Sequence, residues 1–180
     1  MNNIIEKANE CVSCVTKPCQ IGCPFNNDIT SFIKDIKNNS YYHAYQVLSE
    51  TTVLPSICGR VCPYDKQCQG ACVKKVSEKP VSIGQLETFI GDLAIENNWK
   101  IPIEKISKRK EKVAIIGGGP AGLVCAAFLA KKGIHPTIYE KHNYLGGILY
   151  HGIPEFRLPK SVLKTTIDKI LDLGVEIKLN

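Results

Sequence analysis

Apolar residues recur at helical spacing in three segments of the first half of the chain. The first segment follows Asp28, a residue type that caps helices, and the second follows Ser40 and is closed by Pro55. The third follows Ser82, and Gln85 three residues later completes a capping box. The expected core positions are Ile29, Phe32, Ile33 and Ile36; Tyr41, Ala44, Tyr45 and Leu48; and Ile83, Leu86, Ile90, Leu93 and Ala94.

The pattern changes after residue 111, where short apolar runs alternate with helical segments. Val113–Ile116 is typical of a buried parallel strand. The expected order is a strand at 113–116, a helix from the glycine-rich segment 117–122 through Lys132, a strand at 137–140, a helix at 161–173 and a strand at 175–179, with Gly133 and Gly174 ending the two helices. We therefore predict a helical domain at 1–97, a polar linker at 98–111 and an α/β domain at 112–180.

Eight of the nine cysteines lie in two blocks of four within the helical part. The first block is C-x2-C-x4-C-x3-C-P (Cys11, Cys14, Cys19, Cys23 and Pro24), and the second is C-x3-C-x5-C-x3-C (Cys58, Cys62, Cys68 and Cys72). Thiolates are soft donors, and four of them at close spacing suit an iron–sulfur cluster. The spacing predicts two clusters, which would also stabilise a domain with little apolar core. Structural zinc uses similar spacings and stays open as an alternative.

Charge and composition place the chain among ordinary globular proteins. The 180 residues are 44% hydrophobic and 22% charged, with a formal charge of +6. Two clusters with their anionic ligands would lower that charge to roughly +2, so nucleic-acid binding is not favoured. No apolar run reaches the ~18 residues of a membrane span, and the N-terminus has no signal core. We expect a cytoplasmic, reducing location, where motif-spaced cysteines are ligands more often than disulfides. Cys125, in the second half, is expected to be core.

The glycine-rich segment carries a dinucleotide fingerprint in its usual context. Gly117, Gly119 and Gly122 fall between a strand and a helix, where they permit a tight turn, backbone approach to a pyrophosphate and close helix packing. Glu140 ends the second strand, where a carboxylate accepts hydrogen bonds from ribose hydroxyls. The spacing leaves the choice between FAD and NAD open.

Further residues resemble a known family. Gly146-Gly147-Ile148-Leu149 and the segment Gly152–Lys160 look like the FAD-binding segment of the glutamate synthase small (beta) subunit. The same segment is shared by the N-terminal half of dihydropyrimidine dehydrogenase and by the large subunit of NADH-dependent ferredoxin:NADP oxidoreductase. The resemblance runs from about Cys11 to residue 180 and includes both cysteine blocks.

The resemblance implies a helical domain with two 4Fe-4S clusters followed by a Rossmann-like FAD-binding domain. By position, one cluster would be held by Cys11, Cys14, Cys19 and Cys72, and the other by Cys23, Cys62, Cys68 and Glu87. Cys58 would then be a buried cysteine without a cluster, whereas assignment by count gives it the fourth position. The implied FAD contacts are Val61, Gly117, Gly118, Gly119, Pro120, Ala121, Gly122, Glu140, Lys141, Gly147 and Arg157.

The family's chains are longer and continue with an NAD(P)H-binding domain. We expect this sequence to be a fragment whose FAD domain is incomplete, and to be inactive by itself. The complete protein would pass electrons from NAD(P)H through FAD and the clusters to a partner, such as the large catalytic subunit of glutamate synthase. The alternatives are a subunit of an electron-bifurcating ferredoxin:NADP oxidoreductase and a non-catalytic zinc or docking module.

Overall fold

The computed structural model describes residues 2–76, 79–103 and 107–180, and the chain divides into two units, Met1–Trp99 and Lys100–Asn180. Residues 104–106 of the expected linker lie outside the described residues. Among the described residues, no helix combines the length and the apolar character needed to cross a membrane.

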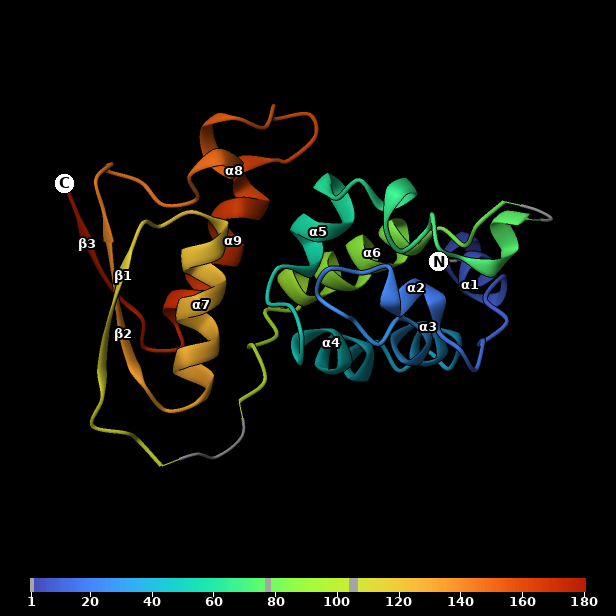
Figure 1. The fold of residues 1–180 in the computed structure, drawn as a ribbon, viewed down its shortest axis with the longest axis horizontal. Coiled ribbons are helices and arrows are strands. Elements are labelled where there is room, and N and C mark those ends of the chain that lie inside the picture. Colours follow the sequence, from blue (N-terminus) through green and yellow to red (C-terminus); the bar gives the residue numbers. More distant parts are fainter. Residues whose placement is uncertain (1, 77–78, 104–106) are drawn as a thin grey trace. The chain divides into compact units, whose positions relative to one another are not determined.

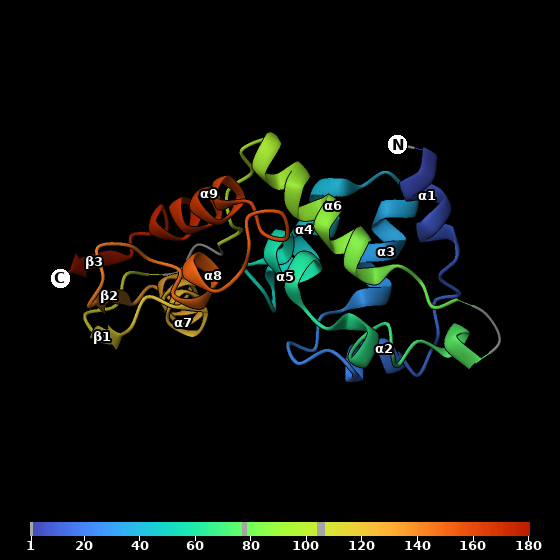
Figure 2. The same ribbon diagram turned by 90° about the horizontal axis from the view of Figure 1, so that it is seen from above.

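The first unit is helical (Figures 1 and 2). Its elements are α1 (Asn2–Asn9), α2 (Pro18–Ile21), α3 (Ile29–Lys37), α4 (Tyr41–Ser49), α5 (Pro55–Val61) and α6 (Ile83–Glu96), with 3-10 turns at Tyr64–Lys66 and Val73–Val76. The pattern of apolar positions predicts α3, α4 and α6. It does not predict α1, α2 or α5, two of which are short helices that begin at a proline.

The core of the first unit consists of the apolar stripes that the sequence predicts. Phe32, Ile33, Ile36, Leu86 and Ile90 are fully enclosed. Among the other expected core positions, Tyr41 and Leu93 are half-buried. Burial of these side chains is what holds the helices together, at about 25 cal/mol per Å² of apolar surface removed from water.

Ser40 and Ser82 are the N-cap residues of α4 and α6, so these predicted helix starts are confirmed. Neither side chain makes a capping hydrogen bond, however, so the predicted capping box at Gln85 is wrong. Instead the Gln69 side-chain oxygen accepts the Gly84 N–H at 2.9 Å, which satisfies one of the free donors of α6.

The prediction for Pro55 was also wrong, because α4 ends at Ser49 and Pro55 begins α5. Proline suits the first helical position, where its missing N–H costs nothing. Asp28, by contrast, caps α3 as predicted, since its carboxylate accepts the Ser31 N–H at 3.3 Å.

Helices α5 and α6 pack against each other at very short range. A Cβ on Gly91 would lie 2.3 Å from the Ser56 nitrogen, and one on Gly59 would lie 2.4 Å from the Gly84 oxygen. Arg60 and Asp92 add a two-pronged ion pair between the helices, with N–O distances of 2.8 and 2.7 Å. The glycines therefore allow the backbones of the two helices to approach each other closely.

The second unit contains a three-stranded parallel sheet in the order β1-β2-β3. Its elements are β1 (Lys112–Ile116), α7 (Pro120–Lys131), β2 (His135–Glu140), α8 (Ile148–His151), α9 (Lys160–Leu171) and β3 (Glu176–Leu179). All but the short α8 correspond to the predicted order. Helices α7 and α9 lie on the same side of the sheet (Figure 1).

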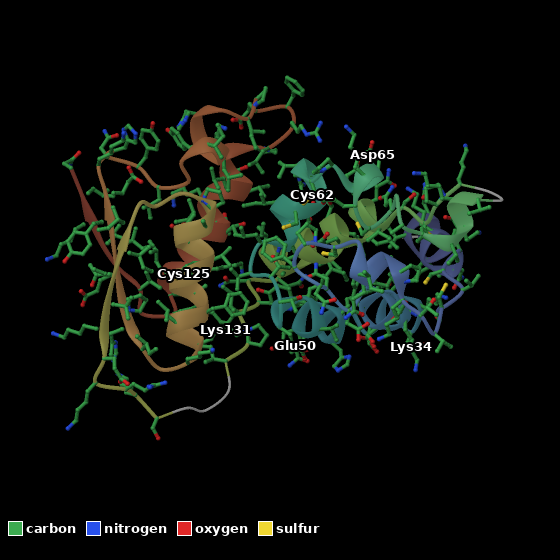
Figure 3. The ribbon with its side chains drawn as sticks, viewed as in Figure 1. Lys34, Glu50, Cys62, Asp65, Cys125 and Lys131 are labelled. Atoms are coloured by element: carbon green, nitrogen blue, oxygen red, sulfur yellow. The ribbon has the colours of Figure 1, made fainter. Side chains whose placement is uncertain are left out.

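Among the described residues of the second unit, helices cover one face of the sheet (Figure 1). Ile115 and Ile138 are buried on the helix side, whereas Ile116 is 85% exposed on the other. The expectation that Val113–Ile116 is a buried strand is therefore not met among the described residues, where β1 lies at the edge of three strands. Cys125 was also expected in the core, but it is exposed on α7 (Figure 3).

Candidate iron-sulfur centres and nucleotide site

Four of the predicted cluster ligands line one cavity of about 20 Å³ in the first unit: Cys11, Cys14, Cys19 and Cys72. Cys11 follows the end of α1, Cys19 lies in α2, and Cys72 directly precedes the second 3-10 turn. The cavity thus joins the first cysteine block to the last cysteine of the second.

Two residues with positive φ angles and two lysine side chains shape the loop that carries Cys11 and Cys14. Ser13 and Lys17 have positive φ angles of 52° and 43°, which bend the chain tightly. The Lys37 ammonium donates to the Cys11 carbonyl at 2.6 Å, and Lys17 pairs with Asp28 at 2.9 Å. These contacts anchor the loop to α3 and hold its two sulfurs toward the same cavity.

Burial disfavours a bare thiolate at Cys19. It raises the pKa of this thiol to about 11, and the neighbouring Cys11 and Cys72 thiols add to the rise. The thiolate is nevertheless the form that binds metal, and bound iron supplies the compensating positive charge. A set of neighbouring cysteines whose thiolates would repel one another is therefore chemically suited to a cluster.

The other four predicted ligands line a second cavity, of about 110 Å³, which also contains Cys58. Cys23 follows α2, Cys62 directly follows α5 (Figure 3), Cys68 follows the first 3-10 turn, and Glu87 lies on α6. Burial raises the pKa of Cys68 to about 12, with further increases from Glu87, Cys23 and Cys62. The negative groups of this set therefore lie close enough to repel one another.

Glu87 is a buried carboxylate in a cysteine-lined cavity. The residue is only 7% exposed. Burial raises the pKa of its carboxyl group to about 8, and the nearby charge of Cys62 contributes to the rise. Asn27, itself buried, donates from Nδ2 to Glu87 Oε1 at 3.3 Å, which lowers that pKa in part. Sequence reasoning missed Asn27, since it belongs to no motif and meets Glu87 only through the packing of α6.

The donors surround cavities and do not meet at a single point. Within residues 2–76, 79–103 and 107–180, no three His, Cys, Asp or Glu side chains are grouped closely enough to hold one metal ion. A 4Fe-4S cluster needs four ligands spread around it, one for each iron. The two cavities have a donor set of that kind, with three or more sulfurs each.

The glycine-rich loop of the second unit has the geometry that the fingerprint requires. Gly117 has a φ of 100°, which favours glycine, and a Cβ on Gly122 would lie 2.0 Å from the Gly117 oxygen. A Cβ on Gly119 would meet nothing within 4 Å, so open space lies beside the backbone there. The loop leads into α7 through Pro120, with Ala121 exposed in its first turn.

Glu140 and Gly147 are both tied to this loop. The Glu140 carboxylate accepts the Gly118 N–H at 2.7 Å and the His142 N–H at 2.9 Å, and these bonds lower its pKa. Gly147, with a φ of 51°, packs so closely that a Cβ would lie 3.0 Å from Gly119 Cα. A nucleotide pyrophosphate therefore fits the free space at Gly119 and the N-terminus of α7.

Three other predicted contact residues lie outside the loop. Lys141 is exposed after β2, and Arg157 is exposed in the segment before α9. Val61 is the half-buried last residue of α5, next to Cys62 in the first unit. Their roles stay predictions.

Comparison with known families divides the chain in the same way. Residues 1–99 match the family described as dihydropyrimidine dehydrogenase domain II, 4Fe-4S cluster. Residues 115–163 match the NAD(P)-binding Rossmann-like domain family.

Individual relatives match almost the whole chain. The glutamate synthase (NADPH) small chain of Escherichia coli K12 is 37% identical over 97% of this chain and 37% of its own length. The glutamate synthase (NADPH) small chain of Halomonas elongata is 36% identical over 96% of this chain and 37% of its own length. The NAD-dependent dihydropyrimidine dehydrogenase subunit PreT of Salmonella typhimurium is 42% identical over 98% of this chain and 42% of its own length. The chain thus spans about two fifths of the length of these oxidoreductases.

These matches confirm the resemblance to the glutamate synthase small chain and to dihydropyrimidine dehydrogenase. The matched 4Fe-4S domain covers more than half of the 180 residues. The chain therefore belongs to the dihydropyrimidine dehydrogenase domain II family of 4Fe-4S proteins and continues into a Rossmann-like domain.

Proposed function

We propose that this chain is the electron-transfer part of an NAD(P)H-oxidising iron–sulfur flavoprotein. Its first unit would hold two 4Fe-4S clusters and its second unit would take part in holding FAD. The observation that carries the proposal is the pairing of donors in two cavities, each of which draws on both cysteine-rich segments. When bound, the flavin exchanges hydride with NAD(P)H and the clusters carry single electrons.

In the first cavity, Cys11, Cys14, Cys19 and Cys72 would bind the first cluster. In the second, Cys23, Cys62 and Cys68 would bind through sulfur and Glu87 through oxygen. A carboxylate is a harder donor than a thiolate and is an unusual cluster ligand. Burial of Glu87 and its bond to Asn27 support this assignment, because they hold the carboxylate among the three sulfurs.

In the second unit, the open space at Gly119 and the free N–H groups at the start of α7 would bind the FAD pyrophosphate. Gly117, Gly118, Pro120, Ala121 and Gly122 would form the rest of that cradle. Glu140, Lys141, Gly147 and Arg157 would contact the remainder of the cofactor, and Val61 would touch the flavin.

The partner would be an electron-accepting subunit, such as the large catalytic subunit of a glutamate synthase. The 37% identity to the Escherichia coli glutamate synthase small chain supports this. The 42% identity to PreT favours a second candidate, a subunit of a dihydropyrimidine dehydrogenase. Mixing the reduced protein with each type of partner subunit and following oxidation of the clusters by absorbance would separate the two.

The central test is the metal content of the anaerobically purified chain. We expect a brown protein with about eight irons and about eight sulfides per chain, as two 4Fe-4S clusters require. Zinc without sulfide would contradict the proposal and favour the zinc module. Separately, added FAD should bind to the second unit in a flavin fluorescence titration, though weakly because the FAD domain is incomplete, and the absence of any binding would contradict its proposed role in holding FAD.

A further inference from the structure

The second cavity contains one donor more than a cluster needs. Besides the three proposed cysteine ligands and Glu87, Cys58 also lines it and is only 6% exposed. Cys58 lies one helical turn before Cys62 on α5, and the Cys62 N–H donates to the Cys58 carbonyl at 3.1 Å. Residues four apart on a helix lie on the same face, so the two side chains are neighbours.

A buried hydroxyl orients Cys58 from the other side. Thr52 is fully enclosed, and its Oγ1 accepts the Leu54 N–H at 3.1 Å and lies 3.8 Å from Cys58 Sγ. Because the Thr52 oxygen already accepts the Leu54 N–H, its own proton is available to the Cys58 sulfur. The Cys58 S–H proton is then available to another acceptor.

The Cys62 sulfur is that acceptor. Both side chains line the second cavity, and they lie one helical turn apart. A sulfur that is bound to iron as a thiolate has no proton, so Cys58 is the donor of this pair and Cys62 the acceptor. The chain of donors runs from the Leu54 amide through Thr52 and Cys58 to Cys62.

We propose that Thr52 and Cys58 form a hydrogen-bond chain that ends on the Cys62 sulfur and raises the reduction potential of the second cluster. This inference rests on the proposed function, since it takes Cys62 as a ligand and leaves Cys58 as a thiol. Reduction adds negative charge to a cluster, and a hydrogen bond to a ligand sulfur stabilises that charge. Cys58 would thus be a positioning and tuning residue, without an iron of its own.

The test compares substitutions in the reconstituted chain. Cys58→Ala removes the donor, Cys58→Ser keeps one, and Thr52→Val removes the hydroxyl while keeping its shape. Thr166→Val is the matched control, because Thr166 is a buried threonine of the second unit whose hydroxyl bonds the Val162 carbonyl. Each protein is measured for iron and sulfide and by a redox titration followed by electron paramagnetic resonance. The signal that Glu87→Gln perturbs identifies the second cluster.

We expect all of these variants to keep the iron and sulfide of the parent. The potential of the second cluster should become more negative in Cys58→Ala and, by a smaller amount, in Thr52→Val. Cys58→Ser should lie closer to the parent than Cys58→Ala, and Thr166→Val should match the parent.

Two results would overturn the inference. One is a second-cluster potential that is the same in the parent, Cys58→Ala and Thr52→Val. The other is loss of about four irons from both Cys58 variants, which would make Cys58 a ligand. A parent protein without iron and sulfide would instead defeat the proposed function and this inference together.

Discussion

Asn27 Nδ2 donates a hydrogen bond to Glu87 Oε1 over 3.3 Å and so joins the segment before α3 to α6. The Thr51 hydroxyl donates to the oxygen of the same Asn27 amide, which fixes the orientation of its NH₂ group toward Glu87. A buried carboxylate with one neutral donor is costly unless another partner balances its charge. An iron ion in the second cavity would be such a partner.

The first prediction concerns Glu87. In Glu87→Gln an amide oxygen remains as a donor to iron, and we expect about eight irons per chain, whereas Glu87→Ala should lose about four because one corner of the second cluster has no ligand. Iron and sulfide analysis measures both. Glu96→Ala is the control, since Glu96 is exposed on the same helix. A Glu87→Ala protein with its full iron content would count against the carboxylate ligand.

The second prediction concerns the close packing of α5 and α6. In a helix, alanine is favoured over glycine by about 1 kcal/mol. In Gly91→Ala, however, the new Cβ would lie 2.3 Å from the Ser56 nitrogen, and overpacking costs about 1–3 kcal/mol or more. We expect a net loss of about 1–2 kcal/mol of unfolding free energy, seen as a lower thermal midpoint.

The same substitution should also weaken the second cluster. Cys62 is at the end of α5 and Glu87 on α6, so a shift between the helices moves two proposed ligands apart. We expect faster iron release to a chelator than in Glu96→Ala, the exposed alanine substitution on the same helix. Unchanged stability and unchanged release would show that the helices can yield without affecting the cavity.

The third prediction separates two glycines of the fingerprint. A Cβ on Gly122 would lie 2.0 Å from the Gly117 oxygen, so Gly122→Ala should destabilise the second unit and abolish FAD retention. A Cβ on Gly119 would meet no protein atom within 4 Å. Gly119→Ala should therefore change the unfolding free energy by less than about 1 kcal/mol. It should nevertheless weaken FAD binding by at least about tenfold, because the new methyl group would occupy the space in which the pyrophosphate approaches the backbone.

Flavin fluorescence titration and thermal unfolding of the two variants distinguish these effects. Each glycine variant is the control for the other, since both introduce a single methyl group. Flavin binding by Gly119→Ala equal to that of the parent would mean that no phosphate approaches the backbone there.

The fourth prediction is a pH dependence of the second unit. The Gly118 and His142 backbone N–H groups lower the pKa of Glu140 below its ordinary value of 4.5. A lowered pKa in the folded state means that the carboxylate contributes stability in full above pH 4.5, and that this contribution is lost as pH falls through the folded-state pKa.

Unfolding of the second unit can be followed through its own amide resonances, which separates it from acid loss of the clusters. We expect the unfolding free energy of the parent to fall more steeply below pH 4.5 than that of Glu140→Gln, which has no titrating group at this position. Parallel pH curves for the two proteins would contradict the role of Glu140.

Local features of the fold could be predicted because neighbouring residues carry them. The apolar spacing after Asp28 specifies α3, and the run of glycines before Pro120 specifies the turn into α7. Helix α5 could not be predicted in this way, because a proline at position 55 is compatible both with the end of one helix and with the start of the next. The exposure of Cys125 was missed for a related reason, because its surroundings depend on which face of α7 the sheet covers.

The sequence by itself determined the number and type of sulfur donors, the three main helices of the first unit and the glycine loop that opens the second. These depend on spacing along the chain, which is local. The family resemblance had already implied that Cys72 groups with Cys11 and Cys19, and the three residues do line one cavity. Only the tertiary structure decided that Asn27 meets Glu87 and that Thr52 lies beside Cys58. Such contacts join distant segments, and they form only when burial of the apolar stripes brings the helices together.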